Sequence, residues 1–284
     1  MRSIRQISVA LAAIMWGLCA VGCGSAGGGL SGGVGVASAP FLVLNLQTGV
    51  ATTANDLPDL SLAAYRTNLM VFRAVEAGVA TTGSTALNFG AQGDEAQATA
   101  TTQRYYLAIF EVTQDQWEVL AGTTPWLGLP AAAGFAPSAI QGDKPAFGVS
   151  LTDANAMLTA SATRFSVTLA LPSEFQWERA CRAGSTGDFC WGTSRSAVTA
   201  GAFATVWETA SGSLGPTAVG SRTASAFGHF DMHGNVWELT AGGALRGGSW
   251  NDSLPMARCA NRLLPALDAD TAHPLVGVRL VALP

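Results

Sequence analysis

Apolar and polar residues alternate in short runs along this chain, and few stretches have the spacing of a long helix. Residues 41–50, FLVLNLQTGV, alternate before a Thr48-Gly49 turn, which predicts a strand and a hairpin. Residues 65–78, YRTNLMVFRAVEAG, form another strand-like run. The first part of the chain is therefore expected to consist of β-strands.

Three segments have helical start and stop signals, and they are residues 111–122, 150–161 and 171–184. A Ser or Thr followed three residues later by Gln is the spacing of a capping box, in which each side chain binds the other residue's backbone N–H. Thr113 with Gln116 has this spacing, and so does Ser173 with Gln176. Both pairs predict helix N-termini.

The ends of these helices are also marked. Gly122 and Gly184 are expected to stop the first and third helices, and Thr152 or Asp153 to cap the second. After Gly184 the chain consists mostly of turns, glycines and short apolar pieces, without an internal repeat. Short helices joined by irregular segments predict an α+β fold.

The N-terminus has the features of an export signal. Arg2 and Arg5 precede an apolar run over 7–20, and small residues follow up to Cys23. The tetrapeptide Ala-Val-Gly-Cys resembles a bacterial lipobox, so residues 1–23 are expected to be a signal peptide and Cys23 the lipidated residue; simple secretion is the alternative. Residues 24–40 have a tether's composition, and residues 41–64 are expected to form an N-terminal extension.

Composition narrows the possible partners. The chain has a formal net charge of −4 and a single lysine, Lys144, so it offers no basic surface for nucleic acid. Its 49% hydrophobic residues suffice for a core. The body keeps Cys181, Cys190 and Cys259, which in an exported protein predicts one disulfide and one free thiol. Spacing allows any of the three pairings.

The densest set of chemically active residues is 228–252, GHFDMHGNVWELTAGGALRGGSWND. With the other blocks of the chain, and in the same order, it resembles the formylglycine-generating enzyme, or sulfatase-modifying factor, domain. The resemblance covers residues 65–284 and implies a loop-rich fold of the C-type-lectin type with short helices. It rests on these blocks: YYLAIFEVTQDQWEVLAG, KPAFGVSLTDANAML, LALPSEFQWERACRAG, FGHFDMHGNVWELT, LRGGSWND, RCANR and VGVRLV.

This resemblance implies a calcium site at DMHGNVWE. Asp231 and Glu238 would provide carboxylates, and Gly234 and Val236 backbone carbonyls, which are the hard oxygen ligands that calcium prefers. The alternative is structural: Asp231 caps a turn and Glu238 pairs with an arginine.

Two histidines in the same block raise the question of a transition metal. His229 and His233 have H-x-x-x-H spacing, which would suit zinc or iron on a helix. Gly234 and the surrounding loop pattern argue against a helix, so no such site is expected. His273 is expected to be a surface or turn residue.

The family's oxidase uses two cysteines after the Gly-Gly-Ser block to hold copper and activate oxygen. Here that segment reads WNDSLPMARCANR, with Asp252 at the position of the first cysteine and the second missing from a shortened loop. Copper is therefore not expected, because Cu(I) requires soft thiolates. The resemblance pairs Cys181 with Cys259 in a disulfide and leaves Cys190 free; the rival pairing is Cys181 with Cys190.

The family's active-site groove would fall at Trp237, Ser249, Trp250 and Asp252. Without the cysteine pair, an aromatic-lined groove can still bind a ligand. The expected function is a binding or scaffold module for a peptide, protein or glycan in the cell envelope. The alternative is an enzyme, either a divergent sulfatase-modifying oxidase or a non-haem iron oxygenase of the same family.

Overall fold

The computed structural model describes residues 39–129, 141–210, 214–264 and 268–283. The predicted signal peptide, Cys23 and all but the last two residues of the tether lie outside these ranges. Among the described residues, no helix has the length and apolar character needed to span a bilayer. The described residues combine short helices, three β-sheets and long irregular connections, as the α+β prediction requires.

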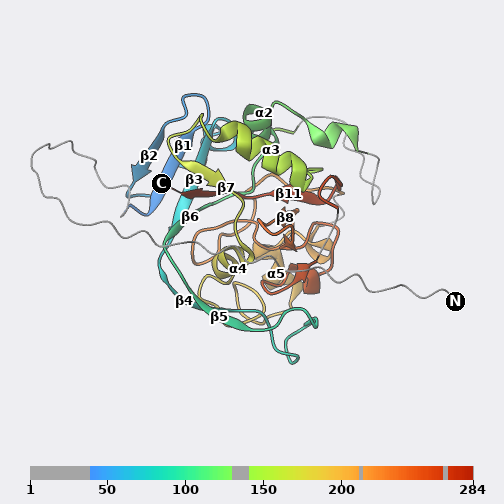
Figure 1. Cartoon of the computed structure of the whole chain (residues 1–284). Helices are drawn as coiled ribbons and strands as arrows, with labels where there is room; N and C mark the ends of the chain where they lie inside the picture. The colour runs from blue at the N-terminus through green and yellow to red at the C-terminus, as the bar shows by residue number, and fades with distance from the viewer. Residues whose placement is uncertain (1–38, 130–140, 211–213, 265–267, 284) are drawn as a thin grey trace, which may run out of the picture. The chain divides into compact units, whose positions relative to one another are not determined.

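A six-stranded antiparallel sheet contains both the first and the last described strands (Figure 1). Its order is β2 (Ala51–Ala54), β1 (Phe41–Asn45), β3 (Leu69–Val75), β6 (Tyr105–Ala108), β12 (Val281–Leu283) and β7 (Thr168–Ala170). The β1–β2 hairpin confirms the prediction for residues 41–50. The run at 65–78 begins differently, because α1 (Ala64–Thr67) precedes β3.

A second, smaller sheet carries the block that the sequence singled out. Its order is β10 (Arg262–Leu263), β9 (Leu245–Arg246), β8 (Trp237–Leu239) and β11 (Val276–Val278). Strands β8 and β11 are parallel, whereas the other pairs are antiparallel. A separate hairpin consists of β4 (Gly78–Thr82) and β5 (Ala98–Thr102), and it lies near α4 (Figure 1).

The predicted helices are present with the predicted kind of cap. They are α2 (Gln114–Ala121), α3 (Leu151–Ser161) and α4 (Glu174–Arg182), and α5 (Ala197–Phe203) follows; three 3-10 turns are η1 (Pro125–Gly128), η2 (Trp207–Thr209) and η3 (Leu254–Ala257). Both predicted capping boxes form. The cap of α3 was misplaced: Ser150 is the N-cap, and Asp153 completes its capping box from inside the helix.

Two of the buried clusters position most of these elements. The larger packs Trp117 of α2 and Met157 of α3 against sheet residues such as Phe72, and it extends to Val236 beside β8. Figure 1 shows α2 and α3 together on one side of the six-stranded sheet. The second cluster surrounds Trp177 of α4. Burial of these large apolar side chains is what holds the irregular 228–252 segment in place.

Candidate functional site

Successive residues of β8 serve two different regions. Because side chains alternate across a strand, Trp237 and Glu238 point in opposite directions. The Trp237 indole is buried and donates its Nε1–H to Oδ2 of the half-buried Asp252 at 2.8 Å. The Glu238 carboxylate is buried and accepts from Trp177 Nε1 at 2.6 Å. We call the interior region the acidic core and define it by Glu111, Asp231, Glu238 and Arg279.

Arg279 is the positive partner within the acidic core. Its guanidinium is fully buried and binds Glu238 through Nε at 3.0 Å and Nη2 at 2.7 Å. Nη1 also donates to the backbone carbonyl of Ala108, and Nη2 to that of Phe230. This pairing is the structural role that the sequence left open for Glu238. Together with Glu238, these carbonyls give each nitrogen of the guanidinium a partner, which a buried charge requires.

Among the residues that the structure describes, neither Asp231 nor Glu111 forms an ion pair with a cation of its own. Asp231 Oδ2 accepts from Gly220 N at 2.6 Å, while Oδ1 has no hydrogen-bond partner among the described residues. Burial raises the pKa of Asp231 to about 6. Glu111 accepts from Asn235 Nδ2 at 2.7 Å, and burial, with Asp231 and Glu238 nearby, raises its pKa well above the usual value. The region therefore has an excess of negative charge.

The calcium ligand set expected from the sequence is compatible with this region. Three carboxylates face one guanidinium, and the unpartnered Asp231 Oδ1 is a free hard-oxygen ligand. Gly234 is required locally, since its φ is +84° and a Cβ would lie 1.9 Å from Thr205 O. The sequence missed Glu111. Its signal was a carboxylate within the apolar run YYLAIFEV, because an acid there needs a partner inside the protein.

His229 and His233 do not converge on one point. His233 Nδ1 is 2.7 Å from Ala257 O, and its Nε2 accepts from Cys190 N at 3.2 Å. Burial lowers the pKa of His233 to about 4. Burial lowers the pKa of His229 to about 3, and Arg279 and Arg73 add to the effect. Both imidazoles are therefore neutral at physiological pH, and the two rings contact different groups.

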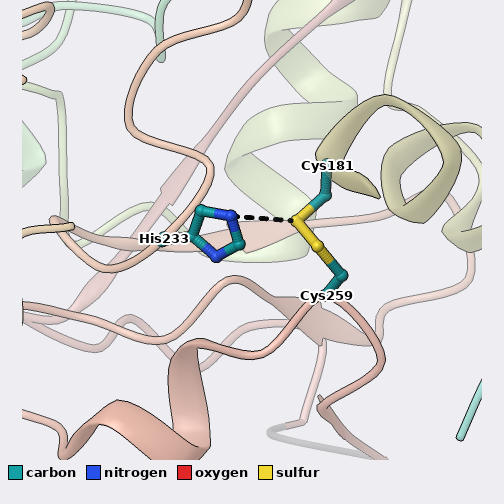
Figure 2. A group of neighbouring side chains, drawn as sticks. All are labelled: Cys181, His233 and Cys259. Atoms are coloured by element: carbon teal, nitrogen blue, oxygen red, sulfur yellow. Dashed lines mark hydrogen bonds between the residues drawn. A yellow bond between two sulfur atoms is a disulfide. The ribbon is translucent and has the colours of Figure 1, made fainter. Parts of the chain in front are cut away.

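The Cys181–Cys259 disulfide is present, as the resemblance implied (Figure 2). It joins the last turn of α4 to the segment after η3, across a sequence separation of 78, with a Cα–Cα distance of 5.7 Å. Among the described residues, Cys190 is the free thiol. Burial raises the pKa of Cys190 to about 12, so little of it exists as the reactive thiolate.

Three of the four expected groove residues are buried, and Trp237 is one of them at 4% exposed. Ser249 and Trp250 are 0% and 1% exposed, so their side chains lie in the interior. Asp252 is half-buried, and its Oδ2 accepts from the Ser249 N–H at 3.0 Å as well as from Trp237. The orientation of the Asp252 carboxylate is therefore fixed by Trp237 of β8 and by the backbone at Ser249.

Two residues beside Asp252 were not expected from the sequence to matter. Trp207 donates its backbone N–H to Asp252 O at 2.9 Å, and Trp207 is 63% exposed. His273 is half-buried; burial lowers its pKa and the nearby Asp252 carboxylate opposes this. We call Trp207, Asp252 and His273 the Asp252 surface. The exposure of the Trp207 ring could not be predicted from the sequence.

A pocket of about 360 Å³ lies elsewhere, between β4 and α4. Its lining includes Arg179 and Arg182, but both guanidinium groups already bind the protein's own carbonyls. Cations that are already paired have little to offer a ligand. This pocket is therefore a weaker candidate than the Asp252 surface.

Comparison with known proteins identifies the domain. Residues 63–283 match the model of the sulfatase-modifying factor enzyme 1-like domain. The chain belongs to this family. A formylglycine-generating enzyme from Mycobacterium tuberculosis is 38% identical over 77 residues, which is 25% of this chain and 26% of that protein. The match thus spans about a quarter of the curated relative's length, so the relative's activity does not transfer directly.

Solved structures agree with the sulfatase-modifying factor fold. PvdO from Pseudomonas aeruginosa is 22% identical, with a TM-score of 0.65 over 75% of this chain and 94% of PvdO. Treponema denticola variable protein 1 is 18% identical, with a TM-score of 0.63 over 76% of this chain and 96% of that chain. CarF is 18% identical, with a TM-score of 0.53 over 74% and 97% of the two chains. At these identities the likeness concerns the fold alone.

Proposed function

We propose that this sulfatase-modifying factor domain is a binding module of the cell envelope that recognises a peptide, protein or glycan through the Asp252 surface. The observation that carries the proposal is the fixed Asp252 carboxylate. By the resemblance, Asp252 would occupy the position of the oxidase's first cysteine. Fold and function are separate questions, and function depends on the groups present at the site.

Among the described residues, the disulfide-bonded protein offers no pair of thiolates to Cu(I). Cu(I) chemistry needs a pair of soft thiolates. Cys181 and Cys259 are bonded to each other, and the remaining described thiol, Cys190, has a pKa raised to about 12. The segment after Ser249 contributes a hard carboxylate instead. This chemistry supports binding rather than oxygen activation.

The Asp252 surface has features that suit recognition. Trp207 presents an exposed indole, a large rigid ring that contributes strongly to interfaces and can stack on a flat ligand face. Asp252 and the neighbouring His273 add a hydrogen-bond acceptor and a titratable ring. An exposed aromatic ring beside fixed polar groups is typical of the residues that anchor a partner at an interface.

The test uses purified protein on glycan and peptide arrays, followed by affinity measurements on any retained ligand. Trp207→Ala and Asp252→Asn are each expected to weaken binding at least about tenfold, which is about 1.4 kcal/mol. Leu57→Ala is the matched control, because it removes an exposed apolar side chain (54% exposed) from the N-terminal extension. Equal affinity for all three variants would contradict the proposed surface.

The enzyme alternative has its own assay. The protein is incubated with Cu(I), oxygen and a peptide carrying a sulfatase-type Cys-x-Pro-x-Arg motif, and conversion of cysteine to aldehyde is read by mass spectrometry. No conversion above a copper-only control is expected. Conversion above that control would overturn the binding-module proposal and show that other residues provide the chemistry.

We also propose that calcium occupies the acidic core and has a structural role. Asp231 and Glu111 would hold it with the carbonyls of Gly234 and Val236, while Glu238, already paired with Arg279, would border the ion. Calcium would supply the positive charge that these carboxylates lack. Support comes from the unpartnered Asp231 Oδ1 and the raised pKa of Glu111.

Export and lipid anchoring at Cys23 are part of the same proposal. A buried disulfide is typical of proteins that mature in an oxidising compartment, which supports export. Labelling cells with palmitate is expected to mark the wild-type protein and not Cys23→Ser. Release of the unmodified wild-type protein into the soluble fraction would contradict the anchor and favour simple secretion.

A further inference from the structure

His233 lies directly against the disulfide. In Figure 2 its ring faces the two sulfurs, and Nε2 is 3.7 Å from Cys181 Sγ. The ligand atoms of Cys181, His233 and Cys259 all lie within 4.8 Å of one another, and all three residues are buried. Nothing in the proposed binding function uses this cluster.

The tautomer of His233 is determined by its partners. The Ala257 carbonyl can only accept a hydrogen bond, so the Nδ1 atom 2.7 Å away carries the proton. Nε2 therefore has the lone pair, which the Cys190 N–H shares at 3.2 Å. A histidine whose Nδ1–H is held by a backbone carbonyl and whose Nε2 faces sulfur has the orientation found in metal-ligating histidines.

We propose that, when the disulfide is reduced, Cys181, Cys259 and His233 form a zinc site. A dithiol reductant supplies two electrons and two protons, the S–S bond breaks, and the reductant leaves as its own disulfide. Zinc then displaces the two thiol protons, and the Nε2 lone pair exchanges its Cys190 hydrogen bond for the metal. The site exists only in the reduced protein, because the disulfide sulfurs lack thiolate charge.

The charge of the cluster selects a divalent ion. Two thiolates and a neutral imidazole balance Zn²⁺ completely, whereas a monovalent ion would leave an uncompensated charge in the interior. The distances agree as well. Tetrahedral zinc with Zn–S of about 2.3 Å and Zn–N of about 2.0 Å separates sulfur from nitrogen by roughly 3.5 Å. The observed 3.7 Å between Cys181 Sγ and His233 Nε2 needs little change.

The sulfurs themselves have to move. Two thiolates on one tetrahedral zinc ion lie about 3.8 Å apart, so the side chains rotate outward once the covalent bond is broken. Zinc would then keep α4 joined to the segment after η3, which is the connection that the disulfide makes in the oxidised protein. The protein would thus exchange a covalent link for a metal link when its surroundings become reducing.

The test measures zinc binding by the purified chain before and after reduction with a phosphine. Competition with a chromophoric chelator is expected to give one zinc ion per chain that appears only on reduction. Substituting Co²⁺ should give a thiolate-to-metal charge-transfer band. Cys181→Ser and His233→Gln are expected to lower the affinity of the reduced protein at least about a hundredfold, since even residues outside a ligand set change metal affinity about 10–100-fold.

Cys190→Ser is the matched control, because Cys190 offers His233 only its backbone N–H. It should retain the site. If a ligand variant fails to fold, iodoacetamide labelling of the reduced wild-type protein decides: zinc should protect Cys181 and Cys259 and leave the labelling of Cys190 unchanged. The proposal is overturned if the reduced protein, still folded by circular dichroism, gains no zinc site, or if zinc protects Cys190 instead.

Discussion

The acidic core and the Asp252 surface are each connected to β8, through the successive residues Glu238 and Trp237, but they differ in their exposure to solvent. Glu238 points inward to Arg279 and Trp177, where every charge needs a partner. Trp237 points toward Asp252, whose carboxylate is held in place but remains partly accessible. One strand thus holds a buried ion pair through one residue and orients a surface carboxylate through the next. Substitutions in the two regions should therefore change different properties.

Arg279→Met is expected to have the largest effect. It leaves three buried carboxylates without their guanidinium, and breaking a buried pair costs about 3–5 kcal/mol. The free energy of unfolding, measured with urea, should fall by that amount. Arg195→Met is the control, since this exposed arginine lies over Phe89 and should contribute only about 0.5–1 kcal/mol. Similar losses of unfolding free energy in both variants would show that the buried ion pair of Arg279 contributes no more than an exposed arginine.

Removal of the disulfide should come next. The Cys181→Ser, Cys259→Ser double variant loses a crosslink with a sequence separation of 78, which typically stabilises by about 2–4 kcal/mol. Thermal unfolding of the variant and the oxidised wild-type protein measures the loss. The double variant is compared with Cys190→Ser, which keeps the crosslink. A loss equal to that of Cys190→Ser would show that the crosslink contributes nothing to stability.

Without calcium, stability should depend on pH through Asp231. Its pKa rises on folding from about 3.8 to about 6, so the folded state binds this proton more tightly. The stabilisation is complete below pH 4 and is lost as the pH rises through 6, by roughly 2–3 kcal/mol. Urea unfolding with a chelator from pH 4 to 7 should show this decline.

Two changes should reduce the decline: added calcium, and Asp231→Asn, which cannot ionise. Asp268→Asn is the control, because Asp268 is exposed. If chelated wild-type protein and Asp231→Asn have parallel stability profiles between pH 4 and 7, Asp231 does not carry the effect.

Trp207→Ala should change stability least. Its ring is largely exposed and its interaction with Asp252 uses only the backbone, so the free energy of unfolding should stay within about 0.5 kcal/mol. Ligand affinity should nevertheless fall, as argued for the Asp252 surface. A large loss of stability would mean that Trp207 belongs to the core rather than to a recognition surface.

Local signals in the sequence predicted much of the fold. The capping boxes at Thr113 and Ser173 were found because both partners lie within one helical turn. The cap of α3 was misplaced because Ser150, Thr152 and Asp153 are all suitable caps, and only the direction of the incoming chain selects among them. The start of β3 was also predicted incorrectly. Residues 65–67 were assigned to the strand but belong to a short helix.

The candidate site was predicted less completely. The resemblance named Asp231, Glu238, Trp237 and Asp252, which the structure arranges in two regions. Glu111 was missed because it lies more than a hundred residues from the loop whose Asn235 side chain and Val236 N–H it binds. Its position becomes meaningful only when two distant segments pack together.

The sequence by itself determined the short helices, the hairpin and the family, because these depend on local hydrogen bonding and on blocks of residues in a fixed order. The tertiary structure decided which groups are buried and which charges meet. It enclosed Ser249, exposed Trp207 beside Asp252 and turned His233 toward the Cys181–Cys259 disulfide. Burial and electrostatic interaction depend on contacts between segments far apart in the chain, and those contacts form only when the loops fold onto the sheets.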